Sequence, residues 1–309
     1  MNDIMLVSLI VTIITAATPL LLASLGELVT ERAGVLNLGV EGMMLVGAVA
    51  AFAVQFTTGS AILGCLAGAA AGTALAFLFG VLTLTLTSNQ VATGLALTIF
   101  GIGLSALAGS GFVGNPVAKL PQLNIPGLSD LPVIGKLVFH HDALVYFSIA
   151  ATFAIAWFLK STRAGLILRA VGESDDSAHS IGYNVIRIRY FAVMFGGAMC
   201  GLGGAYLSLA YTPMWVEEMT AGRGWISLAL VVFAAWRPFR LLAGAYLFGG
   251  IAILQLWLQA RGLLFVPSQV LAMLPYLATI IVLVVISSGP ARSRLGAPAS
   301  LGKPFRASS

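Results

Sequence analysis

AILGCLAGAAAGTALAFLFGVLTLTL, residues 61–86, is a long apolar stretch without a single charged side chain. A helix needs about 20 consecutive apolar residues to cross the hydrocarbon core of a bilayer, and this stretch is longer than that. Gly64, Gly68 and Gly72 recur every four residues, so they fall on one helix face where a neighbouring helix can approach closely. The stretch therefore predicts a transmembrane helix that packs against another helix.

The composition of the whole chain agrees with this stretch. Its 309 residues are 59% hydrophobic and only 9% charged, and the mean hydropathy is +0.99. Soluble domains carry about 25% charged residues because water must solvate their surface, so this composition excludes a soluble globular protein. The 35 glycines suit a packed membrane bundle. Cys65 and Cys200 lie in apolar runs, where we expect small packing residues rather than a disulfide or a metal site.

Similar apolar segments predict an all-α fold, a polytopic transmembrane helix bundle with about nine spans. The segments are residues 4–25, 35–56, 61–86, 91–108, 143–159, 190–211, 225–236, 241–258 and 269–287. The first follows Asp3 without a preceding basic residue, so we expect a membrane helix there and not a cleaved signal peptide. The seventh is too short to cross alone, which favours a broken or re-entrant helix, with Trp225 and Trp236 as interface anchors.

Basic residues predict the orientation of the bundle, because cytoplasmic loops carry an excess of Lys and Arg. Most of the 16 basic residues fall on one side when nine spans alternate, above all in residues 160–189 and 290–309. We therefore expect the N-terminus outside and the C-terminus in the cytoplasm. The domain organisation is then a transmembrane domain over residues 1–289, with an extracytoplasmic loop at 109–142 and a cytoplasmic loop at 160–189, and a cytoplasmic tail over 290–309.

A short helix is predicted within the cytoplasmic loop. Ser174 is a favourable N-cap, the two following acids suit the first turn, and a glycine two turns later suits a C-cap. We predict a helix over about residues 175–181 that acts as a rigid knob for docking another protein; the alternative is a solvated loop with a run of charges. The candidate docking residues are Gly172, Glu173, Ser174, Asp175, Asp176, Ala178 and Gly182.

A polar interruption follows the first span and reads GELVTERAGVLNLGVEGMML, residues 26–45. Polar groups at membrane depth are costly and usually mark a pathway or an internal pair. The glycines around Asn37 and Glu41 favour a broken helix whose backbone lines protein or a water-filled cavity. The alternative is a cytoplasmic turn with a Glu31–Arg32 pair. Glu41 fits that alternative poorly, because it lies several residues into the span.

A second glycine-containing entry occurs at AGRGWISLALVVF, residues 221–233. Gly34 and Gly224 are each expected to begin a helix, with Asn37 or Ser227 three residues later. The two helices would start on opposite sides of the membrane, as an inverted repeat would produce. Asn89 and Gln90 open the fourth span, either as caps or as a polar lining. The candidate pathway residues are thus Asn37, Glu41, Asn89, Gln90 and Ser227.

Catalytic patterns are absent from the sequence. His140, His141 and His179 lack the spacing of a zinc site, and there is no GxxxxGK[ST] phosphate-binding loop. We therefore expect a chain that is not an enzyme and does not hydrolyse ATP by itself. A membrane-embedded enzyme is disfavoured, because no nucleophile–base set or pair of catalytic acids is present.

Several of these stretches together resemble the permease subunit of ABC importers, in the branch that serves simple sugars and nucleosides and is related to ribose and branched-chain amino acid permeases. ERAGVLNLGVEGMML and the stretch around LRAVGES are the most specific. The resemblance covers nearly the whole chain, from about residue 25 to about 285. The matching stretches are residues 31–45, 89–104, 125–139, 163–185, 196–207 and 222–236.

This resemblance implies partners and a location. It implies a second homologous permease in a heterodimer, a cytoplasmic ABC ATPase, an extracytoplasmic solute-binding protein, and the bacterial inner membrane. ATP would bind the ATPase partner, so no cofactor is expected in this chain, and no nucleic acid is expected as a partner. Residues 174–182 fall where the family places its coupling helix, although Asp175 and Asp176 stand where relatives usually have a proline after the first polar residue.

The mechanism expected from the resemblance is ATP-driven alternating access, in which the two permeases rock around a central path. The solute expected is a nucleoside rather than a ribose-like sugar. The alternative is an ion-coupled secondary transporter, which would also use broken helices and polar groups at the midplane. Such a transporter would not need a capped cytoplasmic helix, and it usually has more buried acids.

Overall fold

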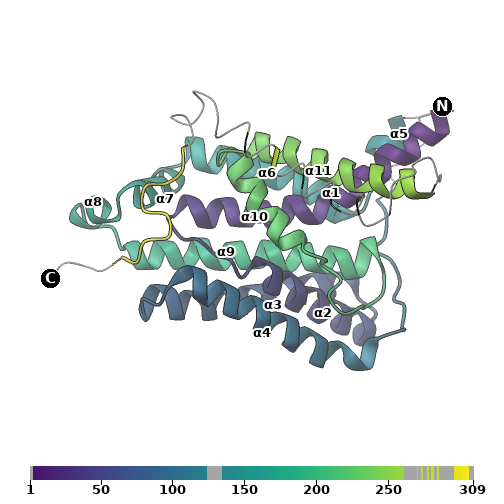
Figure 1. Cartoon of the computed structure of the whole chain (residues 1–309), viewed down its shortest axis with the longest axis horizontal. Helices are drawn as coiled ribbons and strands as arrows, with labels where there is room; N and C mark the ends of the chain where they lie inside the picture. Colours follow the sequence, from purple (N-terminus) through teal and green to yellow (C-terminus); the bar gives the residue numbers. More distant parts are fainter. Residues whose placement is uncertain are drawn as a thin grey trace.

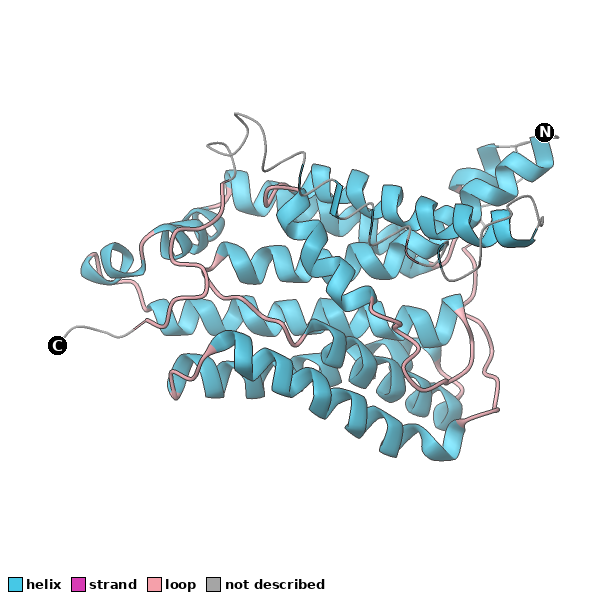
Figure 2. Ribbon diagram, viewed as in Figure 1, coloured by secondary structure: helices cyan, strands magenta, loops and turns pink. Residues whose placement is uncertain are grey.

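The computed structural model describes residues 3–123, 134–260 and 296–305, together with the single positions 270, 273, 277, 280, 281 and 284. Regular structure in these residues is helical, as Figure 2 shows. Only two isolated bridges, Pro116 with Met214 and Gln122 with Asp142, join extended segments there. The predicted all-α class is confirmed.

Seven helices in the described residues are long and apolar enough to cross a membrane. They are α1 (Asp3–Arg32), α2 (Val40–Thr58), α3 (Ala61–Gly80) with the π-helical turn η1 (Val81–Thr85), α4 (Gln90–Gly109) with the 3-10 turn η2 (Ser110–Phe112), α6 (Ala143–Ser161), α9 (Val185–Tyr206) with the π-helical turn η3 (Leu207–Tyr211), and α11 (Pro238–Ala260). The count of nine is thus not confirmed. The expected ninth span, residues 269–287, lies largely outside the described residues.

Four shorter helices complete the described part of the chain: α5 (Ile134–Val138), α7 (Arg163–Glu173), α8 (Asp175–Ser180) and α10 (Arg223–Phe233). The expected short seventh segment is α10, an 11-residue helix that crosses the middle of the bundle in Figure 1. At about 1.5 Å per residue it covers about half of a bilayer core. The predicted short segment is therefore a separate helix, too short to cross alone.

The boundary between the first two spans differs from the prediction. Helix α1 continues to Arg32 instead of ending near residue 25, and α2 begins at Val40 instead of residue 35. The polar side chains Glu27, Glu31 and Arg32 are compatible with a helix because each finds a partner inside the protein. The break is consequently residues 33–39.

Helix α9 lies at the centre of the bundle and packs against α1, α2 and α3. Glycines make its closest contacts. A Cβ atom added to Gly47 would lie 2.5 Å from the Cα of Gly201, and one added to Gly72 would lie 2.9 Å from the same atom. Gly64, Gly68 and Gly72 are all buried on the inner face of α3, which confirms the predicted close packing.

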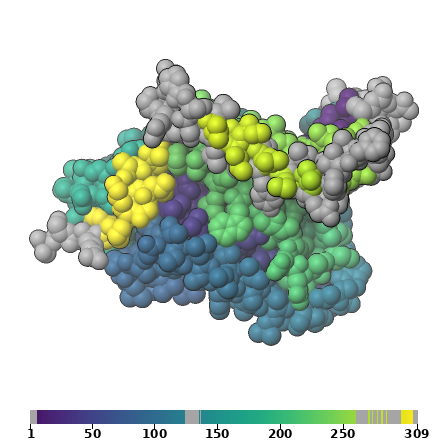
Figure 3. Space-filling view, in the orientation of Figure 1, coloured from purple at the N-terminus to yellow at the C-terminus, as the bar shows by residue number. Residues whose placement is uncertain are grey.

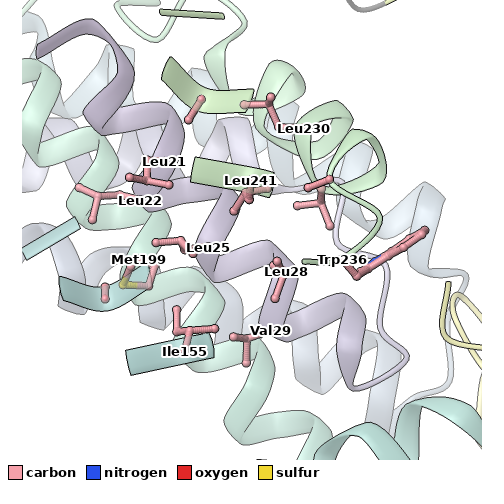
Figure 4. Packing of buried hydrophobic residues seen from close by; sticks show 14 of the residues in the cluster. Leu21, Leu22, Leu25, Leu28, Val29, Ile155, Met199, Leu230, Trp236 and Leu241 are labelled. Carbon is pink, nitrogen blue, oxygen red and sulfur yellow. The ribbon is translucent and has the colours of Figure 1, made fainter. Parts of the chain in front are cut away.

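Leucine-rich packing joins α1 to α9 and α11. Figure 4 shows Leu21, Leu25 and Leu28 of α1 between Met199 of α9 and Leu241 of α11. The outer surfaces of α3 and α4 instead expose large apolar side chains, such as Leu66 and Leu107. Exposed apolar bands of this kind suit contact with lipid.

The two ends of the bundle carry different structures. In Figure 1 the start of α1 and α5 lie at one end, while α7, α8 and residues 296–305 lie at the other. The helices between them run roughly along the long axis. This arrangement places the predicted docking helix at one end and the break at residues 33–39 between that end and the interior.

Candidate functional site

The break between α1 and α2 is held in place by side chains of neighbouring helices. The backbone N–H of Leu36 donates to Oε1 of Gln90 (2.8 Å), and that of Asn37 donates to Oε1 of Glu27 (3.1 Å). The hydroxyl of Thr98 donates to the carbonyl of Leu38 (2.9 Å). A chain that leaves the helical conformation inside a membrane needs such partners, because lipid offers none.

Asn37 shapes the end of this break. Its side chain is fully buried; Oδ1 accepts from the N–H of Gly39 (2.9 Å), and Nδ2 lies 3.4 Å from the sulfur of Met43. The amide thus closes a local turn immediately before α2 begins. Both the oxygen and the nitrogen of the Asn37 side-chain amide therefore have partners within the protein.

Glu41 connects the break to α10. Its Oε1 accepts from the hydroxyl of Thr220 (2.6 Å) and the N–H of Gly222 (2.8 Å), and its Oε2 accepts from the N–H of Gly224 (2.5 Å). The carboxylate is 6% exposed. N–H groups in the first turn of a helix have no partner within the helix, and the helix dipole favours a negative charge there. Glu41 on α2 is thus the cap of α10.

Gly224 allows this contact because it has no side chain. A Cβ atom at residue 224 would lie 2.6 Å from the Cα and from the backbone nitrogen of Glu41. Those are backbone atoms, which cannot move aside cheaply. The glycine is therefore required for α2 and α10 to meet.

The expected parallel between Gly34 and Gly224 is contradicted by the structure. Gly224 lies in the first turn of α10, but Gly34 follows the end of α1 with a φ of +86°, six residues before α2 starts at Val40. The positive φ ends α1, as a glycine after a helix commonly does. Ser227 accordingly differs from Asn37: its hydroxyl lies within a regular helix and donates to the carbonyls of Arg223 (2.9 Å) and Leu20 (3.3 Å).

The two remaining pathway candidates lie at the start of α4. Asn89 is exposed, and its Oδ1 accepts from the N–H of Ala92 (3.0 Å), which is the capping role considered for it. Gln90 is buried and points to the break, and its Nε2 has no hydrogen-bond partner in the described structure. Asn37, Glu41 and Gln90 are thus gathered around one break, Ser227 lies on the adjoining α10, and Asn89 lies apart from them.

A cavity of about 280 Å³ borders α10 on the side of α1 and α11. Tyr211, Arg223 and Gln255 are its polar lining residues. The Arg223 guanidinium lies 5.1 Å from the centre of the Tyr211 ring and donates to the carbonyls of Met219 and Thr220. Arg223 and Tyr211 were not among the predicted pathway residues, although Arg223 directly precedes the glycine that drew attention to this stretch.

The last residues of α1, just before the break, contact Trp236. Glu31 accepts from Nε1 of Trp236 (2.6 Å), and the guanidinium of Arg32 donates to the carbonyl of Trp236 (3.0 Å). The expected alternative, a turn with a Glu31–Arg32 pair, is therefore not formed. Trp236 is 5% exposed, so it is a buried packing residue and not an interface anchor.

The predicted short helix is present as α8. Ser174 is its N-cap, with Oγ accepting from the N–H of Ser177 (3.3 Å), and Gly182 follows with a φ of +93°. Helix α8 ends at Ser180, close to the predicted boundary. Gly172 lies within α7, which continues to Glu173.

The predicted docking residues separate into two groups. Glu173 and Asp176 are exposed, whereas Ala178 is 2% exposed and packs with Val171. Asp175 also turns inward, where its Oδ2 forms an ion pair with Arg189 of α9 at 2.9 Å. Helix α8 therefore presents an outward face and is attached through an inward one.

Arg189 was predicted only as one of the basic residues of the cytoplasmic loop. It is 1% exposed, and besides Asp175 it donates to the carbonyl of Ala33 (3.1 Å) and the hydroxyl of Ser300 (3.1 Å). A buried guanidinium is costly unless all its donors are used, so this arrangement is specific. Its signal in the sequence is weak, because a basic residue at the start of a membrane span is ordinary.

Asp142, in the predicted outer loop, anchors the start of α6. Its Oδ1 accepts from the N–H groups of Leu144 (3.1 Å) and Val145 (3.2 Å), and Oδ2 accepts from the hydroxyl of Tyr206 (3.2 Å). Burial raises the pKa of this carboxyl above its ordinary value, while these hydrogen bonds oppose the shift. Asp142 is thus a cap that also ties the loop to α9.

Comparisons with known proteins point to one family. A family model described as branched-chain amino acid transport system / permease component matches residues 9–286. The putative glucose ABC transporter permease protein TsgC13 of Haloferax volcanii is 44% identical over 93% of this chain and 94% of its own length. The nucleoside ABC transporter permease protein NupC of Lactococcus lactis is 34% identical over 86% of this chain and 88% of its own length.

A guanosine ABC transporter permease protein of Bacillus subtilis, NupQ, is 32% identical over 92% of this chain and 93% of its own length. Each of these three organisms also has a second matching permease whose name gives the same solute as the first. The one in Haloferax volcanii is 31% identical over 62% of this chain and 54% of its own length. No solved structure matches the chain at a significant level.

Proposed function

The chain belongs to the family of branched-chain amino acid transport system / permease components, and from this premise we propose that it moves a nucleoside or a simple sugar into the cytoplasm. It is a multi-pass membrane permease of an ABC transporter, and members of this family are transport components rather than enzymes. The solute class rests on the relatives, which are named as permeases for glucose, nucleosides and guanosine.

The observation that best supports the transport mechanism is how α8 is exposed on one face and attached to α9 on the other. This helix is capped by Ser174, exposes Asp176, follows the exposed Glu173 at the end of α7, and is joined through Asp175 to Arg189 on α9. Because α9 is the central helix of the bundle, a force on α8 acts on the helices that surround the interior. We assign the outward face of α8 to the ATPase, with ATP bound by that partner and the α8 end of the bundle in the cytoplasm.

The proposed path runs beside the break and α10. Asn37, Glu41, Gln90 and Ser227 are hydrogen-bonded within the chain, so in this conformation they shape the wall of the path instead of pointing freely into it. Asn89 would lie at the end of the path, since it is exposed at the start of α4. Rocking of two permeases would change the contacts of α10, the shortest of the helices near the interior.

The partner permease is proposed to be a homologous second subunit. The occurrence of two related permeases in each of the three organisms named above supports a heterodimer. An extracytoplasmic solute-binding protein would deliver the solute at the end where α1 begins, in a bacterial inner membrane. Co-purification of this chain with a tagged second permease, but not with a differently tagged copy of itself, would support that assembly.

The test of the function is uptake by the complete transporter. The chain, its partner permease, the ATPase and the binding protein are reconstituted in liposomes, and labelled guanosine and glucose are supplied separately. We expect uptake of one of them that requires ATP and the binding protein and that persists when ion gradients are collapsed. Uptake without the ATPase, driven by an ion gradient, would instead establish the secondary transporter that was the alternative.

A further inference from the structure

Residues 296–305 lie along the α8 end of the bundle. Figure 3 shows this C-terminal segment, in yellow, on the surface beside α7 and α8. The segment contacts α7 and α8, the end of α1, and the start of α9. Nothing in the proposed function uses the segment.

Ser300 attaches the segment to α7. The backbone N–H of Ser300 donates to the carbonyl of Gly172 (3.0 Å), and its hydroxyl donates to the same carbonyl (2.7 Å). Ser300 is 3% exposed, so these bonds are shielded from water. A hydroxyl with this burial and these partners fixes the register of the segment against α7.

The same segment is attached to the end of α1 and to the break. The N–H of Gly302 donates to the carbonyl of Gly34 (3.2 Å), and the guanidinium of Arg32 donates to the carbonyl of Gly296 (3.1 Å). The two contacts lie on either side of Ser300. The segment therefore bridges α7 and the first residues of the break.

Arg189 joins all of these parts at one point. Its guanidinium donates to Asp175 at the start of α8, to the carbonyl of Ala33 at the end of α1, and to the segment at Ser300. A further bond reaches the carbonyl of Lys303 (3.4 Å). One buried cation thus holds the docking helix, the break and the C-terminal segment in a fixed arrangement.

The far end of the segment contacts α8 itself. The ring of Phe305 lies edge-on to that of His179, with 5.4 Å between the ring centres, and packs against the small buried cluster of Val171, Ala178 and Val185. A helix of six residues is not stable alone, so its position depends on contacts of this kind. Helix α8 is consequently held by the C-terminal segment as well as by its own neighbours.

We propose that residues 296–305 and Arg189 are a mechanical link that transmits displacement of α8 to the break at residues 33–39, with Arg189 and Ser300 as positioning residues. The proposal rests on the proposed function, in which α8 docks on the ATPase. The link joins the docking helix to the segment that carries Asn37 and leads to Glu41. Without it, α8 would still expose its outward face, but its movement would reach the break less directly.

The test measures coupling in the complete reconstituted transporter. Four variants are compared with the wild type: deletion of residues 296–309, Arg189→Gln, Arg189→Lys and Ser300→Ala. The readouts are the amount of ATPase that co-purifies and the number of solute molecules taken up per ATP hydrolysed. Lys303→Ala is the matched control, because the Lys303 side chain is exposed and only its backbone carbonyl binds Arg189.

We expect the deletion and Arg189→Gln to lower uptake per ATP about 5-fold or more, the low end of typical coupling between sites, while the ATPase still co-purifies. Ser300→Ala should have a smaller effect, Arg189→Lys should retain part of the coupling that the glutamine loses, and Lys303→Ala should match the wild type. Should the deletion prevent assembly, Ser300→Ala and the two Arg189 variants decide the question by the same ratio.

Unchanged uptake per ATP in the assembled Arg189→Gln and Ser300→Ala transporters would overturn the link. A parallel fall of assembly and uptake, with the ratio kept, would also overturn it, because the segment would then serve stability alone. A different result would overturn the proposed function: the wild-type transporter would show no ATP-dependent uptake at all, whatever the variants do.

Discussion

Glu41 and Asp175 are two acids in the first turn of a helix that make different contacts in the structure. Each lies in the first turn of its own helix, α2 or α8, where an acid is favoured by the helix dipole. Yet Glu41 turns away from α2 and caps α10 with three hydrogen bonds, whereas Asp175 turns inward to an arginine on α9. The same local pattern thus supports two different long-range contacts.

The difference lies in what neutralises each charge. Glu41 has backbone N–H groups and a hydroxyl as partners, so its charge is balanced by the positive end of α10. Asp175 is 17% exposed and has a full positive charge 2.9 Å away. Replacing Glu41 by alanine leaves three donors without an acceptor, whereas asparagine at position 175 still offers Arg189 an oxygen acceptor, so we expect Glu41 to be more sensitive to replacement.

The largest effect is expected for Glu41→Ala. The change leaves three buried donors without an acceptor and removes the cap of α10, so unfolding in detergent should be easier by about 4 kcal/mol. The measurement is thermal unfolding of the purified chain together with uptake by the complete transporter. Glu41→Gln is the informative control, because it keeps the volume but offers a single acceptor and adds donors that face N–H groups.

Wild-type stability of both Glu41 variants would show that the cap on α10 is dispensable. The contrast with Asp175 would then have no energetic basis. A loss of uptake with wild-type stability would instead place Glu41 in the path, as the sequence alone had suggested.

The next largest effect is expected for Gly224→Ala. The added methyl group would meet the backbone of Glu41 at 2.6 Å, and forced separation of α2 and α10 should cost about 3 kcal/mol. Gly103→Ala on α4 is the matched control, since nothing lies within 4 Å of an added Cβ there and alanine favours a helix. Thermal unfolding of the two variants side by side is the measurement, and equal melting temperatures would contradict the close approach.

The fold class was predictable from the sequence, because long uncharged segments have one solution in a membrane. The short helix at α8 was predictable too, since Ser174 and Gly182 are local signals that act over a few residues. The end of α1 was not. Glu27 and Arg32 resemble the end of a span, and a longer helix becomes favourable only through the contact of Glu27 with Asn37 and that of Arg32 with Trp236, 204 residues away.

Most residues of the candidate site were predicted from the sequence, but their hydrogen-bond partners were not. Asn37, Glu41 and Gln90 do gather around the break, yet the partner of Glu41 lies 179 or more residues away along the chain. The spacing of residues along a sequence does not predict a contact between a side chain and the backbone N–H of a distant residue. Arg189 was missed for a similar reason, because its role depends on the backbone of Ala33 and on Ser300, which carry no signal of their own.

A smaller effect is expected for Asp175→Asn. Arg189 loses one charged partner but keeps its bonds to Ala33 and Ser300, so the cost should be about 2 kcal/mol, typical of a hydrogen bond between charged groups. Asp176→Asn is the matched control on the same turn, because Asp176 is exposed and has no ion pair in the described structure. Hydrogen exchange of α8 should rise in the first variant and stay near wild type in the second; similar exchange in both would refute the role of the pair.

The smallest effect is expected for Ser174→Ala, which tests whether α8 depends more on its cap or on Arg189. Ser174 satisfies one N–H of a six-residue helix, and loss of an N-cap costs about 1 kcal/mol. The effect should be local, since the ion pair of Asp175 and the burial of Ala178 still hold the helix. Hydrogen exchange at Ser177 should therefore rise without a change in thermal unfolding, and Ser180→Ala at the other end of α8 is the control. If Ser174→Ala instead releases α8 as fully as Asp175→Asn does, the cap is the main determinant, and the contrast between a dipole-stabilised and a paired carboxylate does not explain how α8 is held.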